Sequence, residues 1–411
     1  MSSLISFSYE SLRPCILILA ASSLTTIAFH FPTRLHRVFL FPTWLLTAWS
    51  LASVNGDNAS EGPVGLNSYI AIGCIVYMLI LPRILLFKSY SLLAGTGITI
   101  KPGTPSRFAI PVSRASISAA CRIWNNPRHL SFQRPGPGSA PWPKLLKFAL
   151  FRIFKAGVII LVDRVLVQKI RVHLTASSTL FDFTPDQEPI LRRLLEDDED
   201  DPISQHQLIL RAFMCVSWIW ANILILELYH ALLSVVFVVI LRLDDPEDWP
   251  PLFGNPAEAW TVRRFWGKFW HRIASPTFAI WSQLVSHRIL RLKPGSEVDN
   301  AIVAFGIFFL SGLTHAIAAW KIGEGDMDRD VLFFCANFVI VGVEILVSNL
   351  IKNLVWKTKY EVFLRDHRVR LAGKMMGYVW VYAWFFWAAP RWLYPKTLRW
   401  SLRQALLQSR V

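Results

Sequence analysis

The chain has 411 residues, of which 53% are hydrophobic and 17% charged, and its mean hydropathy is +0.39. Soluble domains carry about 25% charged residues, so this composition excludes an ordinary soluble protein and indicates an integral membrane protein with several spans. The net charge of +15 is spread over the connections between apolar runs. This distribution is typical of positive-inside topology and argues against a nucleic-acid-binding surface.

Eight segments approach the roughly 20 apolar residues that a membrane-spanning helix needs. We therefore predict an all-α integral membrane protein with about eight transmembrane helices, forming a single polytopic domain over residues 1–411. The predicted spans are 15–31, 37–54, 66–87, 145–168, 208–240, 300–320, 331–351 and 373–393. The segment 145–168 is the most charged of them, and 208–240 is long enough to require a tilted helix. Glu10 precedes the first span, which favours an uncleaved helix over a signal peptide.

Charge in the loops predicts which side of the membrane each one faces. Residues 62–162 contain twelve bases and no acid, and 242–298 is also basic, so the loops in both regions are predicted to be cytosolic. The acidic segment 171–206 is predicted to be lumenal. So is the loop 55–65, which carries Asn58 in the sequence Asn-Ala-Ser and is the candidate glycosylation site. We predict that this membrane is that of the endoplasmic reticulum.

Three shorter segments complete this picture. The proline- and glycine-rich residues 132–143 predict a stiff irregular loop on the cytosolic side. The C-terminal tail is basic although span parity makes it lumenal. Either one span is miscounted, or residues 397–408 form a basic amphipathic helix lying flat at the interface. The five cysteines include no CxxC pair, so neither a disulfide framework nor a zinc site is expected.

Two histidines are the candidate catalytic residues. His315 lies in the apolar run FFLSGLTHAIAAW. An ionisable side chain at membrane depth is costly and indicates a functional site, and a neutral imidazole is a suitable general base near neutral pH. The alternative is a buried histidine that only bonds a neighbour. His271 ends the run Arg264-Phe265-Trp266-Gly267-Lys268-Phe269-Trp270-His271, which is denser in aromatic residues than an interfacial belt requires.

These residues carry a family resemblance. Trp249-Pro250-Pro251-Leu252-Phe253-Gly254, the FWGKFWH run and Ser311-Gly312-x-x-His315 resemble the wax synthase branch of the membrane-bound O-acyltransferases. Within that branch the chain is most similar to fungal enzymes that acetylate terpenoid or meroterpenoid alcohols. The motifs cover residues 249–315, which would be the catalytic region, with a cytosolic re-entrant or interfacial part. Residues 122–128 resemble a further cytosolic stretch of the branch only loosely.

The resemblance implies the roles of the site residues. His315 would deprotonate the acceptor hydroxyl, which would attack the thioester of acetyl-CoA, and His271 would hold the acceptor, the oxyanion or the CoA. CoA would be a co-substrate, with no bound cofactor and no metal. The candidate CoA-binding residues are Arg263, Arg264, Lys268, Arg272, Trp266 and Trp270. For the bases, ordinary positive-inside charge is an equally good explanation.

Four alternatives stay open. A wax-ester-type enzyme would transfer a longer acyl chain. A membrane prenyltransferase or cyclase would hold Mg-diphosphate at the DDxxD-like runs 244–248 and 197–201, although the predicted topology separates them. A transporter would relay protons through Glu227 and His230, which share a helix face. Finally, Ser311 lies four residues before His315, where a nucleophilic serine would stand, but no GxSxG elbow is present. The acceptor, the acyl length and the oligomeric state do not follow from the sequence.

Overall fold

The computed structural model describes residues 9–54, 66–87, 91–93, 97–99, 111–128, 130, 138–196, 203–325, 327–355 and 366–409. Helices make up almost all of this part. They are α1 (Tyr9–Ala28), α2 (His36–Ala52), α3 (Leu66–Pro82), α4 (Arg114–Trp124), α5 (Trp142–Val162), α6 (Gln168–Ala176), α7 (Ile190–Glu196), α8 (Gln205–Val235), α9 (Val262–Arg264), α10 (Ser275–Leu284), α11 (Glu297–Lys321), α12 (Met327–Val355) and α14 (His367–Gln408).

Several helices continue into a turn of π-helix, in which the backbone bonds span five residues. These turns are η2 (Arg83–Phe87), η3 (Asp163–Val167), η6 (Val236–Ile240), η9 (Phe265–Phe269) and η10 (Val285–Ile289). Short 3-10 turns occupy Thr33–Leu35, Leu180–Phe183, Pro185–Gln187, Pro246–Asp248 and Pro256–Glu258. The only described strands, β1 (Ser91–Leu93) and β2 (Gly97–Thr99), form one antiparallel ribbon in which Leu92 lies opposite Ile98.

The predicted all-α membrane fold is confirmed. Four described helices are long and apolar enough to cross a membrane, namely Asn67–Leu85, Gln205–Ile240, Glu297–Lys321 and Met327–Ile351. Each of them coincides with a predicted span. The first predicted span corresponds to a shorter apolar helix, Leu12–Ala28. The other three predicted spans also form helices: 37–54 lies in α2, 145–168 in α5 with η3, and 373–393 in α14. These helices are shorter or more charged than the four above.

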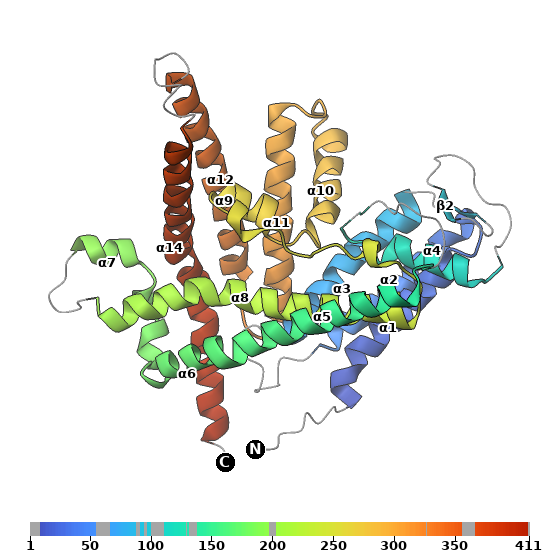
Figure 1. Cartoon of the computed structure of the whole chain (residues 1–411), viewed down its shortest axis with the longest axis horizontal. Helices are drawn as coiled ribbons and strands as arrows, with labels where there is room; N and C mark the ends of the chain where they lie inside the picture. Colours follow the sequence, from blue (N-terminus) through green and yellow to red (C-terminus); the bar gives the residue numbers. More distant parts are fainter. Residues whose placement is uncertain are drawn as a thin grey trace.

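The separate interfacial helix at 397–408 is a wrong prediction. Those residues belong to α14, which continues without a break through Pro390 and Pro395 to Gln408. Its 42 residues correspond to about 63 Å at 1.5 Å per residue, about twice the thickness of a hydrocarbon core. The basic tail is therefore the end of one long helix, which runs from the top of Figure 1 to the C-terminus at the bottom.

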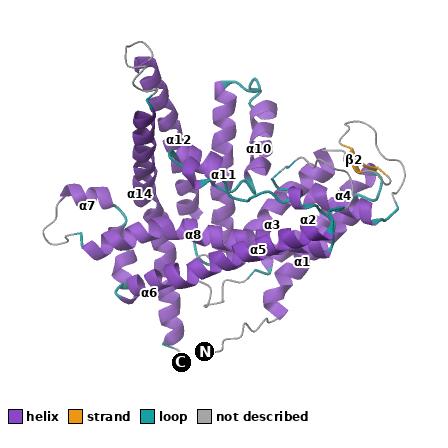
Figure 2. Cartoon of the chain, viewed as in Figure 1, coloured by secondary structure: helices purple, strands orange, loops and turns teal. Residues whose placement is uncertain are grey.

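Two groups of helices meet at the centre of the molecule. In Figure 1, α10, α11, α12 and α14 run upright, while α5 and α8 run across them. The helices α11 and α12 form a hairpin with extensive contact, and α8 packs against both α14 and α5. The segment between α8 and α10 is mostly irregular (Figure 2), and it carries the short helix α9. This segment contains the aromatic motif, so the fold sets that motif against α8, α12 and α14.

Candidate active site

His271 follows a tightly wound helical turn. The side chain of Thr261 accepts a hydrogen bond of 3.0 Å from the backbone N–H of Arg264 and so caps α9. The π turn η9 then ends where Trp270 N–H donates to the carbonyl of Phe265 at 2.8 Å. Trp270 itself is extended, with φ −64° and ψ 148°. This change of direction turns the next side chain, His271, out of the helical turn, and π turns of this kind are common at functional sites.

The Trp-Pro-Pro-Leu-Phe-Gly loop at 249–254 lies directly against this turn. Gly254 N–H donates to the carbonyl of Phe269 at 2.8 Å. A Cβ atom at Gly254 would lie 1.9 Å from the carbonyl oxygen of Lys268, so only glycine permits this approach. The contact brings the ring of Phe253 to 5.5 Å from His271, edge to face. The two sequence motifs thus build one wall of the site together.

The His271 imidazole is uncharged at neutral pH. Its Nδ1 atom is buried and has no hydrogen-bond partner among the described residues. Burial, with smaller contributions from the neighbouring His315 and Arg128, lowers the pKa of His271 to about 3. A neutral imidazole with a buried, unpaired nitrogen can hold a polar group of a ligand.

His315 lies on α11 at the closest approach of the helix hairpin. A Cβ atom at Gly312, one turn before it, would lie 2.9 Å from Cα of Val331, so α12 passes very near. The His315 ring stacks on Phe334 with 4.9 Å between centroids and meets the edge of Trp392 at 6.4 Å. In the described part of the chain, His315 makes no hydrogen bond. Its imidazole is therefore held by ring packing alone.

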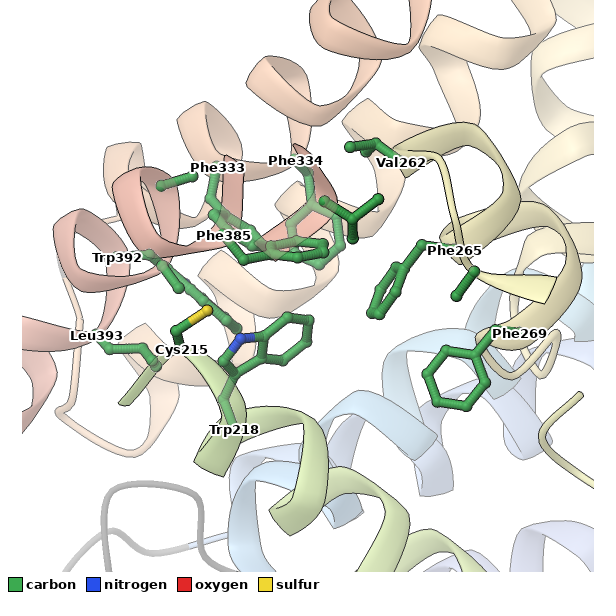
Figure 3. Packing of buried hydrophobic residues seen from close by; sticks show 14 residues of the cluster. Cys215, Trp218, Val262, Phe265, Phe269, Phe333, Phe334, Phe385, Trp392 and Leu393 are labelled. Atoms are coloured by element: carbon green, nitrogen blue, oxygen red, sulfur yellow. The ribbon is translucent and has the colours of Figure 1, made fainter. Parts of the chain in front are cut away.

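One aromatic cluster connects the two histidines. Trp218 of α8 lies at its centre, 5.0 Å from the Trp270 ring and 5.8 Å from the Trp392 ring. Trp270 in turn lies 5.2 Å from His271. Figure 3 shows the side chains of α8, α9 with η9, α12 and α14 converging around Trp218. The chain therefore brings His271 and His315, 44 positions apart in sequence, to the borders of the same apolar cluster.

Polar residues of α12 hold the tryptophans of this cluster. Asn337 Oδ1 accepts hydrogen bonds of 3.0 Å from the indole N–H groups of both Trp266 and Trp384. Asp330 Oδ1 accepts from Trp392 at 2.7 Å and from Lys396 Nζ at 2.7 Å. The sequence prediction missed both anchors; the signal in the sequence is a polar residue, Asn337, inside an apolar run, and the structure shows that it and Asp330 are fully buried.

The six residues predicted to bind CoA differ in their surroundings. The side chains of Arg263, Lys268 and Arg272 are exposed. Arg264 is engaged, since its guanidinium pairs with Glu258 and lies 3.6 Å above the Trp260 ring.

Both predicted tryptophans pack into the aromatic cluster. Trp266 donates its indole N–H to Asn337, and Trp270 stacks on Phe265 at 5.3 Å. Their rings thus support the site from within.

The acidic run at 244–248 has a structural role. Asp244 and Asp248 receive the guanidinium of Arg122 at 3.1 and 2.9 Å. Asp245 accepts the backbone N–H groups of Ser139 and Ala140, both at 3.1 Å. No group of three or more metal-ligating side chains occurs among the described residues. The second acidic run, 197–201, and the sequon at Asn58 lie outside them. These contacts speak against diphosphate binding at 244–248.

The contacts also give no support to the proton-relay and serine-nucleophile alternatives. Glu227 pairs with Lys155 at 2.7 Å, and His230 Nδ1 accepts from Arg152 at 3.2 Å, so both side chains join α8 to α5. No hydrogen bond links Ser311 to His315 in the part that the structure describes. A proton relay and a serine nucleophile therefore gain nothing from the geometry.

Comparison with known proteins agrees with the segment singled out by the motifs. Residues 249–336 match the membrane bound O-acyl transferase family. Acetyltransferase ple2 of Rhodocybe pseudopiperita is 30% identical over 194 residues, 47% of this chain and 48% of that protein. Acetyltransferase atnC of Arthrinium sp is 28% identical over 199 residues, 47% of this chain and 43% of that protein.

A third relative extends the same pattern. Acetyltransferase TRI7 of Fusarium sporotrichioides is 29% identical over 182 residues, 44% of this chain and 40% of that protein. The matched region thus spans about half, or less, of the length of these curated relatives. No solved structure gives a significant match. The resemblance to membrane-bound O-acyltransferases and to fungal acetyltransferases is confirmed over this region.

Proposed function

We propose that this chain is an O-acyltransferase that moves an acyl group from acyl-CoA to a hydroxyl of a hydrophobic acceptor. Its residues 249–336 match the membrane-bound O-acyl transferases, and four of its described helices are long and apolar enough to cross a membrane. The observation that carries this proposal is the pair of histidines bordering one aromatic cluster. Both lie in the matched segment, and among the described residues one has a buried nitrogen without a partner and the other makes no hydrogen bond. We assign the catalytic region to residues 249–315.

In the proposed reaction His315 is the general base. Its free imidazole nitrogen takes the proton of the acceptor hydroxyl while the oxygen attacks the thioester carbonyl carbon. The C–S bond of the resulting tetrahedral intermediate then breaks, and the thiolate of CoA takes the proton from His315. Base catalysis of this kind contributes roughly 10²–10⁴ in rate. The transfer is direct, because no described side chain is hydrogen-bonded to His315 as a nucleophile would be.

His271 is the proposed partner for polar groups of the reacting complex. A neutral imidazole donates one N–H, which suits the oxyanion that forms on the thioester oxygen. Phe253 and Trp270 fix its ring from two sides, 5.5 and 5.2 Å away. The exposed bases Arg263, Lys268 and Arg272, with Arg264 beside them, are proposed to attract the phosphates of CoA to this face.

The acyl group and the acceptor follow from the relatives rather than from the geometry. The three relatives named above are called acetyltransferases, which favours acetyl-CoA. A lipid-soluble alcohol of the terpenoid or meroterpenoid kind would reach an intramembrane site by partitioning into the bilayer. An endoplasmic reticulum membrane is the proposed location, with the CoA route opening to the cytosol.

A product assay tests the proposed function. Membranes from a host expressing the chain are incubated with labelled acetyl-CoA or a labelled prenyl diphosphate and a panel of terpenoid alcohols. We expect label in the product only from acetyl-CoA, with a mass gain of one acetyl group in place of hydrogen. Magnesium-dependent consumption of the diphosphate would instead support a prenyltransferase and contradict the proposal.

A further inference from the structure

Two arginines hold the loop that packs against His271. Arg128, just after α4, donates to the carbonyls of Pro250 and Pro251 at 3.2 and 3.0 Å. Arg152 of α5 donates to the preceding carbonyl, that of Trp249. Three consecutive carbonyls are thus bound by two guanidinium groups. Because adjacent carbonyls of one loop are close together, the two positive charges are close together as well.

The charges of these arginines are not matched by carboxylates. Neither arginine forms an ion pair in the described part of the chain, and each has a buried Nε–H without a partner. Arg152 is only 5% exposed. The nearby carboxylate, Glu227, is already paired with Lys155 at 2.7 Å. The group therefore contains three cations and one carboxylate, and an excess of positive charge around the buried Arg152 is costly unless an anion neutralises it.

The group lies on the His271 side of the aromatic cluster. Arg128 binds the carbonyls of Pro250 and Pro251, and Phe253 of the same loop lies 5.5 Å from the His271 ring. After burial, the charge of Arg272, the residue next to His271, is the largest influence lowering the pKa of Arg128. Arg128 is partly exposed, and so is the side chain of Lys155 at 33%. The group is therefore open to solvent at Arg128 and Lys155.

We propose that Arg128 and Arg152 bind a phosphate of the acyl-CoA co-substrate, so that its thioester arm extends past His271 toward His315. This inference rests on the proposed function, since it assigns the co-substrate of that site. It also gives the loop 249–254 a second role, because the same guanidinium groups fix the loop and receive the phosphate. Charge-assisted bonds from arginine to phosphate are among the strongest in proteins.

A binding experiment with matched variants tests the inference. Binding of CoA is measured on the full-length chain in phosphatidylcholine nanodiscs for the parent, Arg128→Gln and Arg128→Lys. The glutamine can still donate to the loop carbonyls but carries no charge. We expect Arg128→Gln to weaken CoA binding about tenfold or more and Arg128→Lys to weaken it less. The matched control is Arg114→Gln, because exposed Arg114 likewise donates to two consecutive carbonyls, those of Leu241 and Arg242.

A comparison of two acyl donors separates a binding role from a structural one. One donor is acetyl-CoA, and the other is S-acetyl-N-acetylcysteamine, a thioester without phosphate. Arg128→Gln should raise KM for acetyl-CoA, with little change in kcat, and should lower turnover of the phosphate-free donor much less. An equal loss with both donors would show that Arg128 only maintains the loop and would overturn the inference.

The outcomes distinguish this inference from the proposed function. Arg128-dependent CoA binding without acetyl transfer would support the inference and count against the function. Transfer from both donors, with CoA binding that does not depend on Arg128, would support the proposed function and contradict the inference. Phosphatidic acid added to the nanodiscs should not compete with CoA. If it displaces CoA, and Arg128→Gln abolishes this, the group binds a lipid headgroup instead and the inference is wrong.

Discussion

His315 and His271 border the same aromatic cluster, but different contacts hold their side chains in place. His315 is fixed only by rings, Phe334 at 4.9 Å and Trp392 at 6.4 Å, and its nitrogens are free of hydrogen bonds within the described residues. Replacing it with alanine removes the proposed base and little polar bonding. We expect His315→Ala to lower acetyl transfer by at least about 100-fold while the protein still accumulates in membranes.

A matched histidine replacement controls for nonspecific damage. His173 on α6 is exposed and makes no contact that the structure records, so His173→Ala should retain parental activity. Both variants are assayed at equal protein amounts in the same membranes. Activity of His315→Ala within tenfold of the parent would remove His315 as the base.

His271 makes the stability of the chain depend on pH. Its pKa is about 3 in the folded chain and 6.5 as an ordinary histidine. Between these values the unfolded chain binds one more proton than the folded chain, so stability falls as the pH drops below 6.5. The loss is at most about 1.4 kcal/mol per pH unit. His271→Gln lacks this contribution and should lose less stability than the parent between pH 7.5 and 5.5.

Thermal unfolding in detergent at the two pH values measures the difference. The exposed residue His173 again serves as the control, because His173→Gln should show the pH dependence of the parent. An identical loss of stability in the parent and in His271→Gln would mean that His271 is not held neutral by burial.

At the scale of elements, α12 and α14 are joined by a regular series of polar contacts. Asp330, Asn337 and Glu344 are spaced seven residues apart and therefore share one face of α12. They accept indole N–H groups from Trp392, Trp384 and Trp380 of α14, respectively, at 2.7, 3.0 and 2.8 Å. The order reverses along α14, as it must for antiparallel helices. This series aligns the two helices that carry the rings around His315.

Asn337 is the anchor that accepts hydrogen bonds from two indole N–H groups. Asn337→Leu keeps the approximate volume but leaves the indole N–H groups of Trp266 and Trp384 without their acceptor. Each unsatisfied buried donor costs about 1–3 kcal/mol, so we expect destabilisation of about 2 kcal/mol or more, measured by thermal unfolding. Asn349→Leu on the exposed face of the same helix should change little. Equal melting of the two variants would contradict an anchoring role for Asn337.

Substitution of Gly254 tests whether the loop 249–254 must contact the turn that precedes His271. Gly254→Ala would put a Cβ atom 1.9 Å from the backbone oxygen of Lys268, a group that cannot move aside easily. We expect the loop to separate from the turn and acetyl transfer to fall at least about tenfold, since misplacement of site groups by 1 Å can cost about 100-fold. Gly267→Ala is the control, because a Cβ atom there meets nothing within 4 Å. Full activity of Gly254→Ala would show that the contact is dispensable.

The sequence predicted elements well where apolar runs were long and poorly where they were interrupted. The spans at 208–240, 300–320 and 331–351 correspond to α8 with η6, α11 and α12. The helix α10 with η10 was missed, because its apolar part is only about ten residues long and ends in His287 and Arg288. The histidine pair was predicted from local motifs. The anchors Asp330 and Asn337 were not, because their partners on α14 lie 62 and 47 positions away.

At the scale of the whole molecule, charge distinguishes the two ends of the α11–α12 hairpin. The approach to α11 carries Arg288, Arg291 and Lys293, whereas the acids Glu324 and Asp328 lie in the connection to α12 and in the first turn of α12. Positive-inside topology therefore predicts that α11 begins at the cytosolic face and that its connection to α12 is lumenal. This orientation puts the basic group beside His271 on the side where CoA is available, so the proposed CoA route depends on it.

Cysteine labelling in sealed microsomes tests this orientation. Lys293 before α11 and Met327 after it are both exposed, Met327 by 50%. A membrane-impermeant maleimide should label Lys293→Cys in intact vesicles and Met327→Cys only after permeabilisation, each compared with the parent and its five native cysteines. The reverse pattern would put the start of α11 in the lumen. CoA would then have no access to Arg128 from the cytosol, and the proposed route would have to be abandoned even if His315 remained essential.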